Sequence, residues 1–143
     1  MFKKINFQFL ISYFGLIPYV LTFLDKYYFL IVEEEYLLSF ITYYSLIIIV
    51  FIGSINWNLK NNPPTHIVIY GFLPSLFAVM IIILSLLNIN ILIIYILITL
   101  LLFTQLFFDY IILFANETNK KAFYFLRLPL TALIIVFLFL ILL

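Results

Sequence analysis

The sequence predicts an all-α membrane protein that crosses the bilayer five times, as a single transmembrane domain over residues 1–143. Hydrophobic residues make up 68% of the chain and charged residues only 9%, whereas about 25% of the residues in a soluble domain are charged. The mean hydropathy is correspondingly high, at +1.32. The apolar residues also fall into five runs, and each run is close to the roughly 20 residues that a helix needs to cross a bilayer.

Short polar segments separate these runs and define the predicted helices. The runs are too long for strands and do not alternate, and an open sheet cannot leave its edges in lipid. The first break, Asp25–Glu35, carries most of the acidic residues. The later breaks are a turn with two consecutive prolines, a tight connection and a short polar loop. In chain order, the predicted helices are residues 7–24, 36–55, 67–87, 91–114 and 123–143.

The positions of the basic residues predict the orientation of the helices. Lys3 and Lys4 precede the first run as they would in a signal peptide, but no cleavage site of small residues follows, so we expect a retained first helix. Five crossings with the N-terminus inside and the C-terminus outside leave only Lys26 on the outer side. The inner side then holds Lys3, Lys4, Lys60, Lys120, Lys121 and Arg127.

Composition argues against several classes of function. The chain has no cysteine, and its single histidine, His66, cannot form a metal site with three or four protein ligands or a bis-histidine haem site. A net charge of +1 provides no basic surface for nucleic acid. We therefore expect no catalytic residue, no metal and no cofactor, and phospholipid is the one ligand that the sequence leaves open.

Asp109 and Arg127 are the most informative polar residues. An ionised carboxylate inside a bilayer normally faces a partner or a cavity. Asp109 lies about 7.5 Å before the inner end of its helix and Arg127 about 6 Å past the start of the next, at 1.5 Å per residue. The sequence therefore predicts an ion pair. It either locks two neighbouring helices together or forms part of a proton or ion relay, and Arg127 could instead extend to lipid headgroups.

Other polar residues fall near this predicted pair. Gln105 lies one helical turn before Asp109 and faces the same side, where it would bind a backbone carbonyl or a side chain of another helix. Asn56 and Trp57 follow the second helix, either as cap and aromatic belt or as part of a polar cluster with Asp109 and Arg127. Pro18 and Pro74 predict kinks within the first and third helices.

Five groups of residues lie in order along nearly the whole chain. They are Gly15–Pro18, Phe51–Trp57, Tyr70–Leu76, Gln105 with Asp109, and Phe123–Arg127 with Leu130-Thr131. Together they resemble the transmembrane protein 69 family (domain of unknown function 3429). The resemblance implies a helical bundle in a mitochondrial or bacterial inner membrane. The family usually has His-Trp where this chain has Asn56-Trp57, so a role that requires an imidazole does not carry over.

Two functions agree with these features. The preferred hypothesis is a non-catalytic accessory or assembly subunit of a larger respiratory-chain type complex, with other membrane subunits and lipids as partners. It depends on the missing soluble domain, the absence of redox ligands, the scarcity of small residues and a composition typical of AT-rich genomes. The alternative is a small proton- or ion-coupled transporter that uses Asp109 and Gln105.

Overall fold

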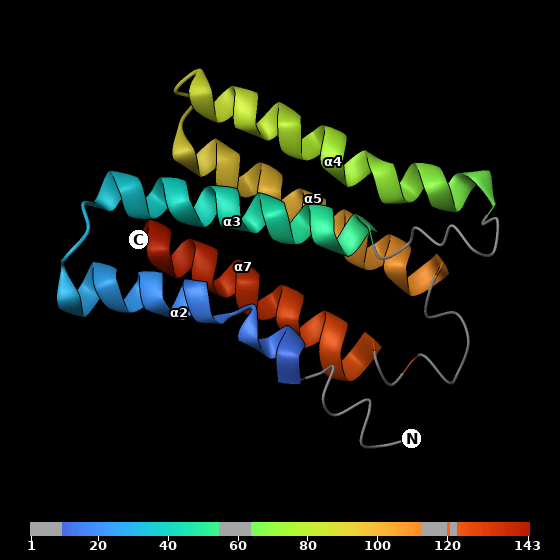
Figure 1. Ribbon diagram of the computed structural model, residues 1–143, viewed down its shortest axis with the longest axis horizontal. Helices are drawn as coiled ribbons and strands as arrows, with labels where there is room; N and C mark the ends of the chain where they lie inside the picture. The colour runs from blue at the N-terminus through green and yellow to red at the C-terminus, as the bar shows by residue number, and fades with distance from the viewer. Residues whose placement is uncertain (1–9, 55–63, 113–119, 121–122) are drawn as a thin grey trace. The chain divides into compact units, whose positions relative to one another are not determined.

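The computed structural model describes residues 10–54, 64–112, 120 and 123–143. Every regular element within these ranges is a helix (Figure 1), which confirms the all-α fold class. The π-helical segment η1 continues α2, and η2 leads directly into α7. The elements are α2 (Ile17–Leu24), η1 (Asp25–Phe29), α3 (Glu34–Ser54), α4 (Thr65–Leu86), α5 (Ile91–Ile112), η2 (Phe123–Arg127) and α7 (Leu128–Leu142).

Four of the described helices are long and apolar enough to cross a membrane. They are Glu34–Ser54, Thr65–Leu86, Ile91–Ile111 and Phe123–Leu142. Their ends fall close to those predicted for the second to fifth spans. Four helices of this length and composition indicate an integral, multi-pass membrane protein.

The helix predicted over residues 7–24 is interrupted and extends further than expected. Residues 10–14 are helical, residues 15–16 form a turn, and η1 carries the helix five residues beyond Leu24. Pro18 explains the interruption, because it has no N–H to donate and its ring clashes with the preceding turn. The N–H groups of Gly15 and Leu16 instead reach back three residues, at 3.1 and 3.0 Å.

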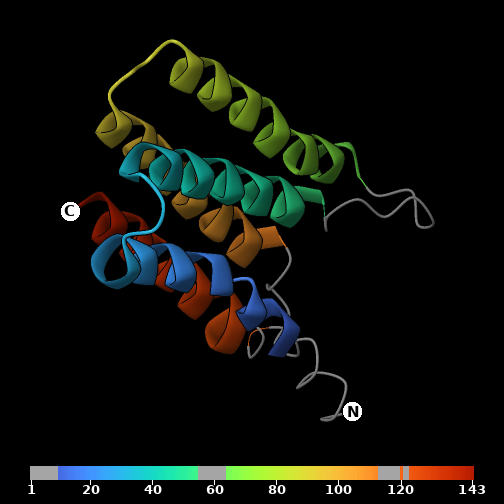
Figure 2. The ribbon, with the colours of Figure 1, turned by 60° about the vertical axis from the view of Figure 1, so that its left-hand side comes forward.

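The connection between α4 and α5 is the tight turn that its asparagines predict (Figure 2). Asn88 adopts the left-handed conformation, with φ of 56°, which asparagine tolerates better than most residues. The Asn90 carboxamide oxygen accepts the N–H of Leu92 at 2.9 Å, as an N-cap residue does. Each asparagine therefore ends or begins a helix.

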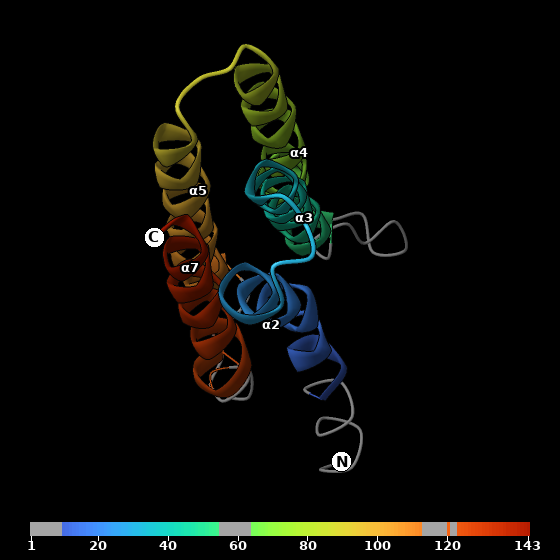
Figure 3. The ribbon, with the colours of Figure 1, turned by 90° about the vertical axis from the view of Figure 1, so that its left-hand side faces the viewer.

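The helices belong to two compact units. Unit 1 comprises Met1–Ile41 and Asp109–Leu143, and unit 2 comprises Thr42–Phe108. The single domain expected over residues 1–143 stays a prediction. In unit 1, α2 packs against α7, and the two helices run side by side in the same direction (Figures 1 and 3).

η1, which continues α2, caps the C-terminal end of α7. The last four carbonyls of a helix have no partner within the helix. Lys26 donates from Nζ to the Ile141 carbonyl at 2.6 Å, and the Tyr27 hydroxyl donates to the Leu140 carbonyl at 2.8 Å. The positive charge of a lysine at this position also interacts favourably with the negative end of the helix dipole.

The start of α7 has a similar contact with the N-terminal segment. Pro129 cannot donate an N–H, so the Phe125 carbonyl four residues earlier lacks its usual α-helical partner. The Tyr13 hydroxyl donates to this carbonyl at 2.9 Å. Between the two ends, the ring of Phe137 contacts those of Tyr19 and Phe23. The N-terminal segment therefore holds α7 at both ends and in the middle.

Replacing Tyr13 with phenylalanine should lower the free energy of unfolding by about 0.5–2 kcal/mol. Hydrogen bonds between membrane helices contribute about 0.6 kcal/mol on average, and an unpaired carbonyl adds a penalty. Thermal unfolding in detergent measures the change. Tyr28→Phe is the control, because no hydrogen bond of the Tyr28 hydroxyl is found among the described residues. Equal losses in both variants would contradict this role of Tyr13.

Leu30 ends η1 in the left-handed conformation, with φ of 53°, which is unfavourable for a residue with a Cβ by about 1–2 kcal/mol. We expect Leu30→Asn to raise the free energy of unfolding by about 0.5–1 kcal/mol, because asparagine tolerates this conformation. Ile31→Asn is the matched control, since Leu30 and Ile31 are 75% and 79% exposed and only Leu30 has a positive φ. The two melting temperatures in detergent test the prediction, which fails if both variants shift alike.

Candidate functional site

The last turn of α5 and the end of η2 form a buried ion pair. The Nε of Arg127 lies 2.5 Å from Oδ2 of Asp109, and the side chains are 13% and 2% exposed, respectively. The two residues are 18 positions apart in the chain and both belong to unit 1. The ion pair expected from the sequence is therefore present. Because both charges are removed from solvent, each depends on the other to remain buried.

The backbone that presents Arg127 is itself irregular. η2 is a π-helical turn, and Pro129 lies two residues after it, within the first turn of α7. Single π-helical turns are uncommon and often occur at functional sites. At the start of η2, the ring of Phe123 is buried and contacts Tyr110 on α5, with centroids 5.1 Å apart. This aromatic contact supports the same pair of helices as the ion pair.

Two polar atoms near the ion pair remain unpaired among the described residues. Arg127 uses Nε for Asp109, whereas its Nη2 is buried without a hydrogen bond. Thr131, one turn further along α7, is 1% exposed and its hydroxyl has no partner either. Thr22 and Thr104, in contrast, donate to the carbonyls four residues before them. Buried groups of this kind usually pair with ordered water.

Gln105 forms a second polar contact, in unit 2. Its Nε2 donates to the Ile49 carbonyl of α3 at 2.9 Å. Its backbone carbonyl accepts the Tyr70 hydroxyl of α4 at 3.0 Å. Gln105 thus connects three helices through backbone carbonyls, as expected for a polar residue that joins membrane helices. Its Oε1 is buried and unpaired in the described part of the chain.

No protein-family model, curated protein or solved structure matches the chain. The resemblance to the transmembrane protein 69 family therefore stays a prediction. The assignment of function depends on the contacts described above.

The structure describes the sites of the two predicted helix kinks but not the remaining residues of the expected polar cluster. Asn56 and Trp57 lie outside the described residues, so a cluster of them with Asp109 stays a prediction. Around Pro18 the helix is interrupted, whereas α4 continues through Pro74. Next to Pro74, the Ser75 hydroxyl donates to the Phe72 carbonyl of the same helix at 2.6 Å.

A close contact joins α3 and α4, although the scarcity of small residues in the chain favours few contacts of this kind. A Cβ placed on Gly53 would lie 2.8 Å from Cγ of Pro74 and 2.9 Å from the carbonyl oxygen of Gly71. Gly71 and Pro74 are both buried. Small residues let membrane helices approach closely. The sequence feature that indicates this contact is the pair Gly53, near the end of one predicted helix, and Gly71, near the start of the next.

Among the described residues, no group of three or more His, Asp or Glu side chains could hold a metal ion. Asp109 faces Arg127, which supplies its counter-charge. The ion pair therefore holds the end of α5 and the end of η2 together.

Proposed function

We propose that the protein is a non-catalytic accessory or assembly subunit of a larger inner-membrane complex. The observation that carries this proposal is the ion pair, because it joins the buried Asp109 to Arg127. Gln105 is likewise engaged with the backbones of two other helices. The main buried polar side chains thus serve helix–helix contacts, and a subunit that acts through its surface needs nothing more.

The proposed topology is five spans with the N-terminus inside, and the pairing of α2 with α7 supports it. The first crossing would run from residue 10 to Phe29. It comprises helical residues 10–14, a turn, α2 and η1. They lie alongside α7, which is part of a candidate span, and run in the same direction. A first and a fifth crossing must run in the same direction. The distribution of basic residues favours this orientation.

The setting we propose is a respiratory-chain type assembly of a mitochondrial or bacterial inner membrane. It is motivated by the AT-rich composition and by the resemblance to the transmembrane protein 69 family. Other membrane subunits and lipids would cover the exposed apolar faces of the helices.

Native gel migration after mild detergent extraction tests the proposal. An assembly subunit should migrate with a complex several times larger than its own 17.0 kDa, and mass spectrometry of that band should identify its partners. Migration only as a monomer or small homo-oligomer would contradict the proposal. An Arg127→Met variant should lose the large complex, because the ion pair supports the fold that the partners bind.

A small proton- or ion-coupled transporter is the second candidate. It is favoured by the buried Nη2 of Arg127 and the Thr131 hydroxyl, which have no hydrogen-bond partner in the part of the chain that the structure describes. Protein reconstituted in vesicles should then dissipate a pH or ion gradient, and Asp109→Asn should abolish that flux while Gln105→Leu reduces it. Absence of flux from the wild-type protein under any gradient would rule this function out.

A further inference from the structure

Unit 1 contains an apolar groove between its first helix and the start of α3. Its volume is about 540 Å³, within the range of small-molecule binding sites. Both helices and the loop between them contribute to its walls. Its main apolar and aromatic wall residues are Leu21, Phe29, Val32, Tyr36, Leu37 and Phe40.

Thr22 and Asp25 in the groove walls already have hydrogen-bond partners within the chain. The Thr22 hydroxyl donates to the Pro18 carbonyl at 2.8 Å. The Asp25 carboxylate accepts the N–H of Val32 at 3.0 Å and that of Ile31 at 3.4 Å. These side chains require no hydrogen bond from a ligand. A hydrocarbon chain therefore suits the groove better than a polar molecule.

The loop beside the groove is strongly acidic. Residues 25–35 contain four acids and one lysine, which gives a net charge of −3. Lys26 pairs with Glu34 at 2.8 Å and also binds the end of α7. Its positive charge is therefore already balanced by Glu34. Glu33 and Glu35 are exposed. An anionic headgroup would be repelled here, whereas an ammonium group would be attracted.

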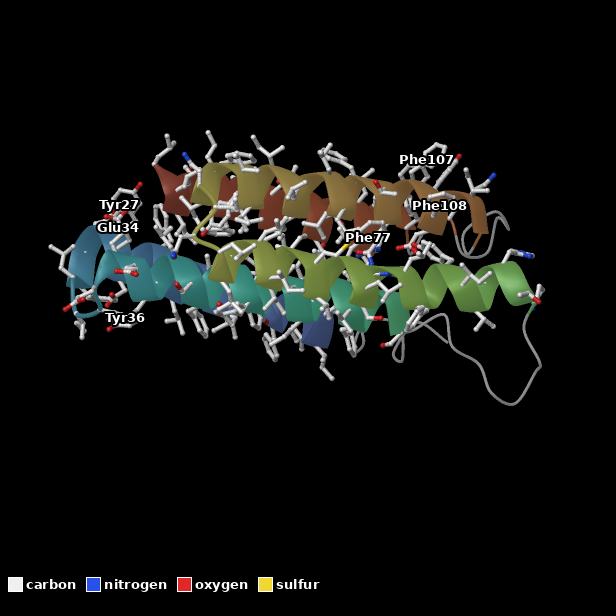
Figure 4. The ribbon with its side chains drawn as sticks, turned by 90° about the horizontal axis from the view of Figure 1, so that it is seen from above. Tyr27, Glu34, Tyr36, Phe77, Phe107 and Phe108 are labelled. Carbon is white, nitrogen blue, oxygen red and sulfur yellow. The ribbon has the colours of Figure 1, made fainter. Side chains whose placement is uncertain are left out.

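The polar and apolar features meet at the same end of unit 1. Tyr36 lines the groove directly next to Glu35, and Val32 lines it directly next to Glu33. Figure 4 shows Tyr36, Glu34 and Tyr27 gathered at this end. A lipid whose chain occupies the groove would therefore carry its headgroup to the acidic loop.

We infer that the groove binds one acyl chain of a zwitterionic, amine-bearing phospholipid, with its ammonium group near Glu33 and Glu35. This lipid is distinct from the bulk lipid around the helices, because the groove holds its chain and the loop selects its headgroup. The inference does not depend on the proposed function, since it uses only contacts within unit 1.

Native mass spectrometry of the full-length protein in mild detergent tests the inference. The probes are palmitoyl-oleoyl phosphatidylethanolamine, the phosphatidylglycerol with the same chains, and oleate. Wild-type protein should retain one phosphatidylethanolamine and bind the other two about tenfold more weakly, a difference of about 1.4 kcal/mol. Equal retention of phosphatidylglycerol or oleate would overturn the headgroup assignment.

Variants that fill the groove separate this site from general lipid binding. Leu21→Trp fills it from α2 and Val32→Trp from the loop, and either should lower phosphatidylethanolamine retention about tenfold. Ile47→Trp is the matched control. Ile47 is 63% exposed, compared with 57% for Leu21, and it lines a different apolar groove, of about 400 Å³, in unit 2. Equal retention in all three variants would overturn the groove assignment.

Charge variants test the headgroup contact without altering the groove. The double variant Glu33→Gln/Glu35→Gln should bind phosphatidylethanolamine and phosphatidylglycerol equally, because the repulsion and the attraction are both reduced. An unchanged preference for phosphatidylethanolamine would show that the acidic loop does not recognise the headgroup.

Discussion

Replacing Arg127 with methionine is expected to lower the free energy of unfolding by about 3–5 kcal/mol, the typical effect of leaving one partner of a buried ion pair without its counter-charge. Asp109 is 2% exposed, so without Arg127 its carboxylate would be buried without a counter-charge. This loss weakens the contact between the end of α5 and the start of α7. Thermal or denaturant unfolding in mild detergent measures the change.

The double variant Asp109→Leu/Arg127→Met should recover most of this loss. Replacing both charges of a buried pair with apolar residues is often neutral or stabilising. Glu34→Gln is the matched control, because it breaks an ion pair whose acid is 62% exposed and should change stability by less than about 1 kcal/mol. A double variant no more stable than Arg127→Met would contradict this account.

Replacing Gly53 with alanine should force α3 and α4 apart. The added Cβ would lie 2.9 Å from the backbone oxygen of Gly71, which cannot move without its helix. Overpacking of this kind costs about 1–3 kcal/mol, whereas alanine gains up to about 1 kcal/mol in helix propensity over glycine. The cost of the clash should exceed the gain in helix propensity, so Gly53→Ala should lower the free energy of unfolding. Gly53→Val should lower it further, because valine adds two further carbons.

Ser54→Ala provides the comparison for Gly53. Ser54 is the next residue of α3 and is exposed, and among the described residues its hydroxyl bonds only to the Phe51 carbonyl of its own helix. Its replacement should change stability by less than about 0.5 kcal/mol. If Gly53→Ala were as stable as Ser54→Ala in detergent, the close approach of α3 and α4 would be wrong.

The sequence predicted the features that depend on composition and on short separations in the chain. Four spans follow from runs of apolar residues, and the ends of α4 and α5 follow from Asn88 and Asn90. The Asp109–Arg127 pair was predictable because both residues lie at similar depths on consecutive helices. In each case, the residues involved are close in sequence or identified by charge.

The contacts that the sequence did not predict join residues far apart or involve the backbone. Tyr27 binds a carbonyl 113 positions away, and uniformly apolar helices do not indicate which face meets which neighbour. The acceptor of Gln105 is the Ile49 carbonyl, a group that every residue has. Gly53 was visible as a small residue, but its partners Gly71 and Pro74 depend on how α3 and α4 are aligned.

The length of the last candidate span determines which bilayers suit it. Phe123–Leu142 is 20 residues long, or about 30 Å at 1.5 Å per residue, which equals the thickness of a typical hydrocarbon core. The ion pair of Arg127 lies inside this length, whereas the Lys26 cap on the Ile141 carbonyl lies at its end. A thicker or thinner bilayer would have to deform or tilt the helix. Unit 1 should therefore be most stable in lipids of intermediate chain length, and a stability series over graded chain lengths would reveal that optimum.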